Sequence, residues 1–231
     1  MTPVLTPLVI SLGGSLLNQE GYADSFADLL KPFLSKRRFA VVTGGGQKAA
    51  AYAEAARKRM AGKTGAEFYA DSDAIEATRE NAADLKKAFG KAAYEKIIIQ
   101  PFQAVAALKK KNIVLSGGFL PGITTDACSV LVAEAIGADR VINASRIDGI
   151  YDKNPSEFSD ARRFDRLTHA ELVDMAFRFD QRKARTNFVF DVVAAKLAAR
   201  SQIKIDFVDG RDLTQLKAAI EAKGFEGTRV R

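Results

Sequence analysis

Two loops in the middle of the chain combine glycine, threonine and aspartate, residue types that suit phosphate and nucleotide binding. The first, residues 116–122, contains three glycines and leads into a Thr-Thr-Asp segment at 124–126. The second, residues 148–152, follows the short apolar run 141–144. In an open α/β sheet, ligands bind beyond the carboxyl ends of the strands. We therefore expect both loops at a ligand site.

Two more glycine loops follow apolar runs near the amino terminus. Gly13-Gly14-Ser15 comes after residues 8–12, and Gly44-Gly45-Gly46 comes after residues 39–43. The first fits a plain turn as well as it fits a phosphate site. The second precedes an Ala-rich helical segment, so free N–H groups and the helix dipole favour an anion there. The second loop is not a Walker A loop, because the four-residue spacer and the Gly-Lys-Ser/Thr ending are missing.

The second glycine loop also matches the pattern G-x-G-x-x-A through Gly44, Gly46 and Ala49. This match keeps a nicotinamide oxidoreductase as an alternative class. A dinucleotide fold needs an acidic residue about 20 positions later, at the end of the next strand. Glu67 has this spacing but follows a loop with no strand before it.

The counts of cysteine and histidine exclude several kinds of site. The one cysteine, Cys128, cannot form an internal disulfide and fits a buried position in an apolar helix. The one histidine, His169, excludes two-histidine metal sites and weakens a Ser-His-Asp triad. His169 follows Thr168, and Glu171 completes a Thr-x-x-Glu capping box, which predicts a helix start.

The net charge of +7 favours anionic ligands. Lysine and arginine cluster at 36–38 and 109–111, where expected helix ends account for them through the helix dipole. We see no known nucleic-acid-binding module and expect no nucleic-acid partner. No apolar run approaches the roughly 20 residues of a membrane helix, and no signal peptide is visible. We expect a cytoplasmic protein without membrane contacts.

Strand-like and helix-like segments alternate along the chain. We predict strands at 8–12, 39–43, 97–99, 113–115, 203–208 and 227–230 and helices at 26–34 (kinked by Pro32), 47–59, 73–89, 126–136, 168–177, 188–199 and from 212. We expect residues 60–72 to form a mobile connection and residues 156–166 to form a surface excursion. The alternation predicts an α/β fold, a three-layer αβα sandwich with a mostly parallel central sheet, forming one domain over residues 1–231.

Taken together and in order, these motifs resemble those of the amino acid kinase superfamily. The match rests on Gly13-Gly14-Ser15, Gly44-Gly45-Gly46, Gly117-Gly118 with Pro121-Gly122 and Thr124-Thr125-Asp126, Asn143-Ala144 with residues 147–152, and Gly227-Thr228. Within the superfamily, the archaeal-type uridylate kinases are the most similar group. The resemblance covers almost the whole chain.

The resemblance implies transfer of the γ-phosphoryl group of ATP to UMP, with Mg²⁺ and a homohexameric assembly. Carried over by position, the expected catalytic residues are Gly13, Gly14 and Ser15, and we add Lys183 and Arg185 as hypothesised catalytic cations. The expected UMP-binding residues are Gly44, Gly45, Gly46, Lys48, Arg79, Gly118, Thr124, Thr125 and Asp126. The expected ATP-binding residues are Asn143, Asp148, Gly149, Tyr151, Asp152 and Pro155. No side chain is assigned as a metal ligand.

The chain departs from the family pattern on the acceptor side. Ser11 stands where many members carry lysine, and Ala50 stands where a phosphate-binding arginine is usual. We hypothesise that Lys48, Lys183 or Arg185 supplies the missing positive charge. The departures leave two alternatives open: a kinase of this fold for another small phosphate or carboxylate, and a nucleotide-binding storage or regulatory protein with little turnover.

Overall fold

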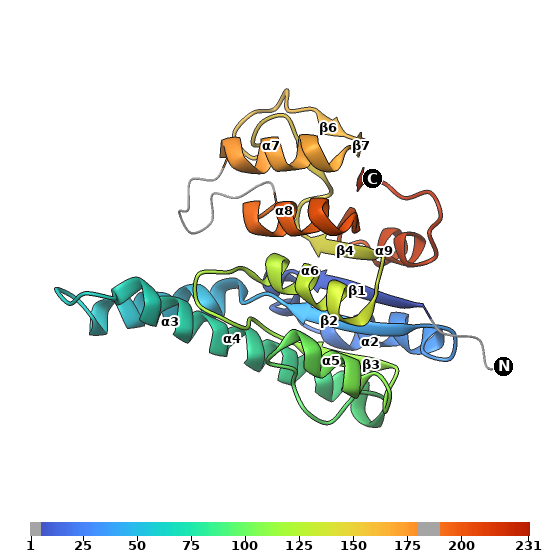
Figure 1. The fold of residues 1–231 in the computed structure, drawn as a ribbon, viewed down its shortest axis with the longest axis horizontal. Helices are drawn as coiled ribbons and strands as arrows, with labels where there is room; N and C mark the ends of the chain where they lie inside the picture. The colour runs from blue at the N-terminus through green and yellow to red at the C-terminus, as the bar shows by residue number, and fades with distance from the viewer. Residues whose placement is uncertain (1–5, 180–189) are drawn as a thin grey trace.

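Seven strands form one central sheet in the computed structural model, which describes residues 6–179 and 190–231 (Figure 1). Their order is β3-β2-β1-β4-β8-β9-β7, and only the β8–β9 pair is antiparallel. The strands are β1 (Pro7–Leu12), β2 (Arg38–Thr43), β3 (Ile113–Ser116), β4 (Arg140–Ser145), β7 (Arg166–Leu167), β8 (Lys204–Asp209) and β9 (Thr228–Val230). The prediction of a mostly parallel sheet is confirmed.

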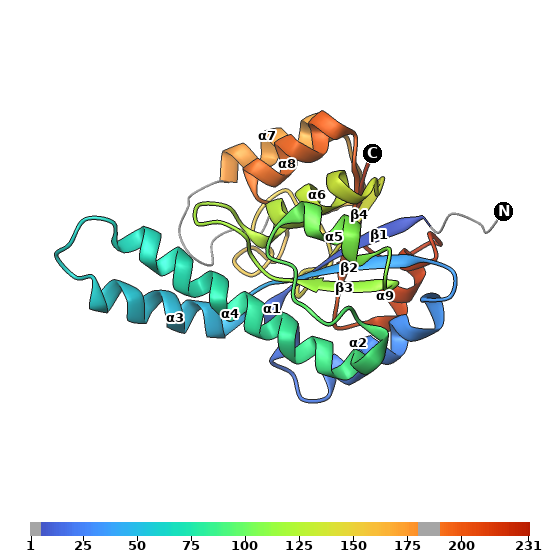
Figure 2. The ribbon, with the colours of Figure 1, turned by 60° about the horizontal axis from the view of Figure 1, so that its bottom comes forward.

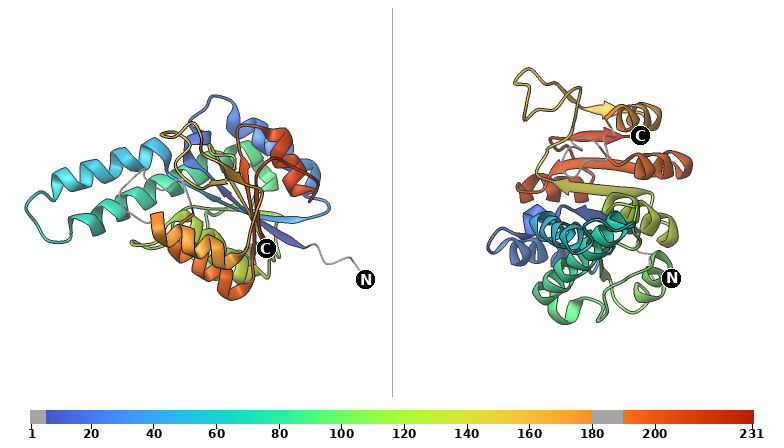
Figure 3. Two further views of the ribbon diagram at one scale, coloured as in Figure 1. Left: turned by 90° about the horizontal axis from the view of Figure 1, so that it is seen from above. Right: turned by 90° about the vertical axis from the view of Figure 1, so that its left-hand side faces the viewer.

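Helices cover both faces of the sheet, which gives the expected three layers (Figure 3). Along β1, Val9 faces the core on one side, whereas Leu8 and Ile10 face the core on the other, because side chains alternate along a strand. The first core takes in α5 (Pro101–Ala107), α6 (Thr125–Ile136), α7 (His169–Phe179) and α8 (Val192–Ser201). The second takes in α1 (Gly14–Leu17), α2 (Tyr22–Leu30), the later turns of α4 (Ala66–Phe89) and α9 (Leu213–Ile220).

The hairpin of α3 (Gly46–Arg59) and α4 projects from the body of the molecule (Figure 2). The helix α4 begins at Ala66, directly after Gly65 in the left-handed region (φ +88°). Our expectation of a mobile connection over residues 60–72 was therefore wrong for residues 66–72. Ala53, Ala56 and Ala70 pack between the two helices and explain the early start, since helix packing supplies stability that local sequence lacks.

Residues 97–99 do not form the expected strand. A single bridge links Ile98 to Ser116, with a hydrogen bond of 2.9 Å from Ile98 N to Leu115 O. Pro101 then opens α5, so the chain leaves the sheet edge after one contact. Similarly, the excursion after residue 155 returns as β6 (Arg163–Phe164), which pairs with β5 (Ile150–Tyr151) in a separate two-stranded sheet.

The predicted helix boundaries near the site are confirmed by their caps. Thr124 caps α6 through a hydrogen bond accepted from Ala127 N, and Gly137 ends that helix in the left-handed region. At α7, Thr168 and Glu171 form the reciprocal capping box, with Thr168 N donating to Glu171 Oε2 at 2.7 Å. The described part of the helix expected at 188–199 begins at Val192, and the 3-10 helices η1 (Lys31–Phe33) and η2 (Gly90–Ala92) follow α2 and α4.

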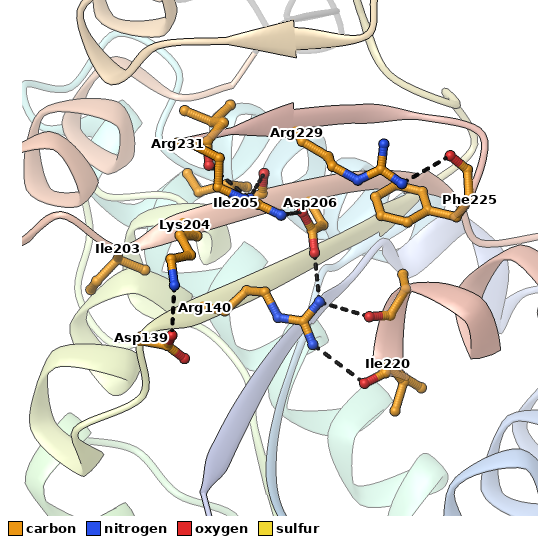
Figure 4. Close-up of polar contacts among 12 residues, drawn as sticks. Asp139, Arg140, Ile203, Lys204, Ile205, Asp206, Ile220, Phe225, Arg229 and Arg231 are labelled. Atoms are coloured by element: carbon orange, nitrogen blue, oxygen red, sulfur yellow. Dashed lines mark hydrogen bonds and ion pairs between the residues drawn. The ribbon is translucent and has the colours of Figure 1, made fainter. Parts of the chain in front are cut away.

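Charged side chains fasten the carboxyl-terminal strand β9 to the sheet (Figure 4). Asp206 is fully buried and binds Arg140 Nη1 at 2.7 Å through Oδ2 and Arg231 Nη2 through Oδ1. Arg140 also donates to the carbonyls that end α9. On the same strand, Thr228 Oγ1 accepts a hydrogen bond from Ile150 N at 2.8 Å. The carboxyl terminus thereby positions the loop before β5.

Candidate active site

A cavity of about 510 Å³ lies beyond the carboxyl ends of β1, β2 and β4. Its wall is built from the glycine loops after β1 and β2, the first turn of α6 and the loop after β4. The lining residues that were predicted from sequence are Gly13, Gly14, Ser15, Gly44, Gly45, Gly46, Thr125, Asp126, Asn143 and Gly149. Four segments that are remote in sequence thus meet where a parallel sheet places its ligands.

The two glycine loops touch each other and leave no room for side chains. A Cβ atom on Gly14 would lie 2.4 Å from Gly44 O and from Gly46 N. Gly46 has φ +59° and begins α3, so its backbone conformation also favours glycine. Asn81 of α4 holds the second loop by donating to Gly44 O at 2.9 Å. No side chain caps α3, which leaves backbone N–H groups of its first turn available to an anion.

Asp126 supplies the carboxylate of the cavity. Its Oδ1 accepts hydrogen bonds from Ser11 Oγ (3.0 Å) and Asn143 Nδ2 (2.8 Å). Burial, together with the nearby charge of Asp191, raises the pKa of Asp126 to about 6, although the two hydrogen bonds act in the opposite direction. A carboxylate held by neutral groups at this position attracts a cation.

The loop after β4 brings an arginine to the cavity. Ser145 Oγ donates to Ile147 O and accepts from Ile147 N, both at 3.1 Å, and this pair of bonds fixes the turn around Arg146. Asp148 is not available to Arg146, since it binds Tyr151 Oη at 2.7 Å and the guanidinium of Arg163. Arg146 is exposed and forms no ion pair with any residue in 6–179 or 190–231. Among those residues it is the one cation that lines the cavity.

A smaller cavity of about 230 Å³ adjoins the first and shares Gly45 and Thr125 with it. It runs between α4 and the loop before α6, and it includes the predicted residues Gly118 and Thr124. Its carboxylate is Asp71, whose Oδ2 accepts a hydrogen bond from Gly122 N at 2.9 Å. This cavity therefore offers polar groups from both the helical hairpin and the third glycine loop.

Comparison with known proteins agrees with this arrangement. Residues 6–209 match the model of the amino acid kinase family. The chain belongs to the amino acid kinase family. It is 38% identical to the uridylate kinase of Methanospirillum hungatei over 230 residues, which cover 96% of this chain and 94% of that protein. It is also 38% identical to the uridylate kinase of Archaeoglobus fulgidus over 212 residues, or 91% of this chain and 94% of that protein.

Solved structures extend the comparison to three dimensions. The crystal structure of the uridylate kinase from Archaeoglobus fulgidus superposes with a TM-score of 0.84 at 34% identity, covering 97% of this chain and 99% of that one. The UMP kinase of Ureaplasma parvum shares the fold at a TM-score of 0.77, with 18% identity and 99% of both chains covered. This amino acid kinase family member thus has its fold in common with both.

Several predicted residues of this family member lie outside the two cavities. Lys48 Nζ binds Glu80 Oε2 at 2.7 Å, and this hydrogen bond raises the pKa of Lys48. Arg79 donates from Nε to Gly118 O at 3.2 Å and so holds the third glycine loop. Pro155 lies in the turn region after β5 and lines neither cavity. Lys183 and Arg185 fall outside the described residues.

Three predicted ATP-side residues stabilise the loop around β5 in this structure. Asp148 and Tyr151 bind each other, and burial raises the pKa of the Tyr151 hydroxyl to about 12. Asp152 accepts a hydrogen bond from Arg162 N at 2.9 Å and closes the hairpin with β6. Their roles toward a nucleotide stay predictions.

Sequence reasoning missed part of the lining in this family member. The missed residues are Ser11, Leu12, Ser145, Arg146, Ile147, Ile150, Phe190 and Phe207 in the larger cavity and Ala49, Asp71, Ala74, Ile75, Thr78 and Ile123 in the smaller one. Asp71 was overlooked because its segment was taken for a connection. Glu67, weighed as a ribose ligand of a dinucleotide, is exposed in α4 and binds Arg57 instead.

The described part of the chain holds no group of three or more histidine, cysteine, aspartate or glutamate side chains that could bind a metal ion. Within residues 6–179 and 190–231, no helix is both long enough and apolar enough to cross a membrane.

Proposed function

We propose that this protein is a uridylate kinase, which transfers the γ-phosphoryl group of ATP to UMP and releases ADP and UDP. One observation carries the proposal: two abutting glycine loops and the Thr-Thr-Asp start of α6 converge on one cavity, in a chain that is 38% identical to a uridylate kinase over nearly its whole length. The expected cytoplasmic location stays a prediction.

In the proposed reaction, an oxygen of the UMP phosphate attacks the γ-phosphorus of ATP. A new P–O bond forms, the bond to the β,γ-bridging oxygen breaks, and its electron pair leaves with ADP. The second pKa of a phosphate monoester is about 6, so the acceptor is already a nucleophile near neutral pH. The site therefore needs no general base, and catalysis consists of positioning and charge neutralisation.

The chain offers two sources of positive potential toward the phosphates. The first source is the first turn of α3, whose backbone N–H groups have no side-chain cap and follow the glycine loop that lines the larger cavity. The second is Arg146, which lines the cavity from the loop after β4. The guanidinium can bind phosphate oxygens with two parallel hydrogen bonds, whereas an ammonium is a point charge. We assign to Arg146 the role of binding the donor phosphates. The positive charge missing on the acceptor side was a separate expectation, which the sequence assigned to Lys48, Lys183 or Arg185.

The residues of the cavity fit Mg²⁺ held mainly by nucleotide phosphates. Asp126 is a partly buried carboxylate in the wall, bonded to neutral partners, with a pKa raised to about 6. It is the side chain that would hold the ion, directly or through water. When bound, Mg²⁺ would supply further neutralisation of the transferred group.

We place the nucleoside part of the acceptor in the smaller cavity. It joins the larger one at Gly45 and Thr125, so a nucleotide can extend from one to the other. Asp71 and Thr78 supply side-chain oxygens there, while Ile75 and Ile123 supply apolar surface for a base. Arg79 supports this cavity from outside by holding Gly118.

We extend the proposal to a homohexamer. Large apolar side chains are exposed in the single chain, including Phe68 (58% exposed), Phe102 (66%) and Phe177 (68%), and subunit contacts would cover such groups. Size-exclusion chromatography with light scattering measures the assembly. A monomer at micromolar concentration would contradict this part without affecting the proposed reaction.

The experiment that tests the function measures ADP release from Mg·ATP with UMP, CMP, dUMP or AMP as acceptor. Fast turnover confined to UMP supports the proposal. Transfer to a different acceptor would indicate another kinase of this fold. ATP binding without phosphoryl transfer to any of these nucleotides would contradict the uridylate kinase proposal and favour a storage or regulatory role.

A further inference from the structure

Three basic segments that are far apart in sequence meet at the amino ends of β2 and β3. We call residues 36–38, 86–96 and 109–111 the basic corner. Phe39 N donates to Asn112 O at 2.8 Å, and Asn112 Nδ2 donates to Leu34 O at 2.8 Å, which joins the first segment to the third. Tyr94 N donates to Ile113 O at 3.0 Å, and Lys111 Nζ donates to Lys91 O at 2.7 Å, which joins the second.

The basic corner holds most of the uncompensated charge of the protein. Its single carboxylate is Glu95, whereas its cations are Lys36, Arg37, Arg38, Lys86, Lys87, Lys91, Lys96, Lys109, Lys110 and Lys111. This excess is larger than the net charge of +7 of the whole chain. Of these ten, only Lys87 forms an ion pair within the described residues, with Asp84 at 2.7 Å. Seven of the lysines are exposed.

Neither helix ends nor substrate attraction accounts for this arrangement. The helix dipole stabilises a few cations at the carboxyl end of each helix. It does not offset the electrostatic repulsion among three clusters of cations that the fold brings together. The nucleotide cavity lies beyond the carboxyl ends of the strands, and the basic corner lies at their amino ends. The positive charge at the amino ends of the strands therefore indicates an anionic partner other than the nucleotide substrates.

The composition of the corner favours one class of partner. None of the exposed large apolar side chains of the described chain lies in its three segments, whereas a membrane-surface site inserts such groups. Lysine is depleted in the cores of protein–protein interfaces, and eight of the ten cations here are lysine. The two aromatic residues of the corner, Phe89 and Tyr94, are buried and half-buried. Exposed lysines without exposed aromatic side chains are typical of contacts to phosphate backbones, and such contacts position a nucleic acid without reading its sequence.

We propose that the basic corner binds the phosphate backbone of a nucleic acid, without sequence preference. This revises the expectation of no nucleic-acid partner, which considered the clusters at 36–38 and 109–111 one at a time. The inference does not depend on the kinase activity. A bound nucleic acid would lie at the amino ends of β2 and β3, whereas the cavity lies at the carboxyl ends of the sheet strands. Nucleotide turnover and nucleic-acid binding can therefore occur together.

Fluorescence anisotropy with a labelled single-stranded RNA of about 20 nucleotides tests the proposal. The test variant carries Lys109→Gln, Lys110→Gln and Lys111→Gln. If these lysines contact phosphates, affinity at about 50 mM salt falls at least about tenfold, and the slope of log K against log salt becomes shallower by about 2. The matched control carries Arg57→Gln, Lys58→Gln and Arg59→Gln, which removes the same charge from the end of α3, where each cation pairs with a carboxylate.

Binding that weakens in the test variant and stays within about twofold in the control supports the proposal. Equal loss in both variants would show a response to net charge alone and would overturn it. It would also be overturned by wild-type protein that binds vesicles with anionic lipid but not RNA. Thermal unfolding checks that the variants are folded, and the pair Lys36→Gln and Lys91→Gln repeats the test if the triple variant is not.

Discussion

Ser11 donates a hydrogen bond from its hydroxyl group to Asp126 Oδ1, 3.0 Å away, across 115 positions of sequence. Asn143 lies directly opposite Ser11 in the register of β1 and β4 and donates to the same oxygen. Two neighbouring strands thus hold the carboxylate at the start of α6 with neutral groups. No side-chain cation of the described residues pairs with this carboxylate, which agrees with the proposed role of Asp126 in holding Mg²⁺.

The raised pKa of Asp126 predicts a stability that depends on pH. Its pKa is about 6 in the folded protein and 3.8 in a solvated chain, so the folded state binds the proton more tightly. Proton binding by Asp126 therefore stabilises the folded state. This stabilisation is complete below pH 3.8, the ordinary pKa of the group, and is lost as pH rises through about 6. Asp126→Asn removes this dependence. Relative to that variant, the wild type should lose about 3 kcal/mol of unfolding free energy between acid and neutral pH.

Urea unfolding of the ligand-free protein at a series of pH values measures this difference. Ser11→Ala is the second variant: it removes a hydrogen bond that lowers the pKa of Asp126, so the transition should move to higher pH. Parallel pH profiles for the wild type and Asp126→Asn would contradict the assignment.

The contact between the two glycine loops predicts opposite outcomes for neighbouring residues. In Gly14→Ala, the new methyl group would meet backbone atoms of Gly44 and Gly46 at 2.4 Å, and neither loop can yield without opening the cavity. We expect a destabilisation of about 1–3 kcal/mol and a loss of at least about 100-fold in turnover with UMP. In Gly13→Ala, the methyl group meets its nearest neighbours at 3.4 Å, so activity should stay within a few-fold. Equal activity of the two variants would show that the loops do not abut.

Arg146 predicts a specific loss on the donor side. Arg146→Gln should lower kcat/KM for ATP by about 100-fold, because charge on the transferred group loses its side-chain cation. Arg146→Lys should recover only part of this loss, since lysine lacks the bidentate geometry. Lys48→Ala should change little, since Lys48 faces Glu80.

Steady-state kinetics are measured with ATP and UMP varied one at a time, and the affinity for ATP is measured at equilibrium. Together, these measurements distinguish donor binding from turnover. Arg200→Gln, which breaks an exposed pair with Glu134, serves as the control. An unchanged affinity for ATP together with full activity in Arg146→Gln would remove this residue from the mechanism.

Local signals in the sequence were sufficient for the strands β1 and β2 and for the glycine loops that follow them. Buried apolar runs that end in glycine predicted β1 and β2 to within a residue, because few other structures tolerate both features. The capping box at Thr168 and the stop at Gly137 were correct for the same reason: the residues that make the contact are neighbours in sequence. The fold class followed from the alternation of elements.

What sequence reasoning could not provide depends on packing between distant segments. Residues 66–72 are helical because α3 packs against them, and no local pattern announces that contact. Asp71 reaches the smaller cavity for this reason alone. Arg146 resembles an ordinary loop residue until the structure shows Asp148 engaged elsewhere. The basic corner likewise exists only after folding brings its three segments together.

The buried ion pairs around Asp206 predict a large effect on stability far from the cavity. Asp206 is fully buried and binds both Arg140 and Arg231 (Figure 4). Asp206→Asn leaves Arg140, itself 8% exposed, without its carboxylate. Breaking one side of a buried pair costs about 3–5 kcal/mol. Chemical denaturation measures the loss. Arg229→Gln on the neighbouring strand β9 is the control, because Arg229 stacks on Phe225 and forms no ion pair with a described residue.

Asp206→Asn also tests whether the carboxyl terminus positions the loop before β5. Arg231 fastens the end of β9, and Thr228 on that strand accepts the hydrogen bond from Ile150 N beside the cavity. Loosening β9 should therefore raise KM for ATP more than KM for UMP, since Ile150 lines the larger cavity and not the smaller one. We expect Arg231→Gln to show this asymmetry with a smaller loss of stability than Asp206→Asn, because Arg231 is partly exposed and its removal leaves Asp206 still paired with Arg140. Equal rises in KM for ATP and KM for UMP would mean that β9 supports the fold as a whole and does not position the loop before β5.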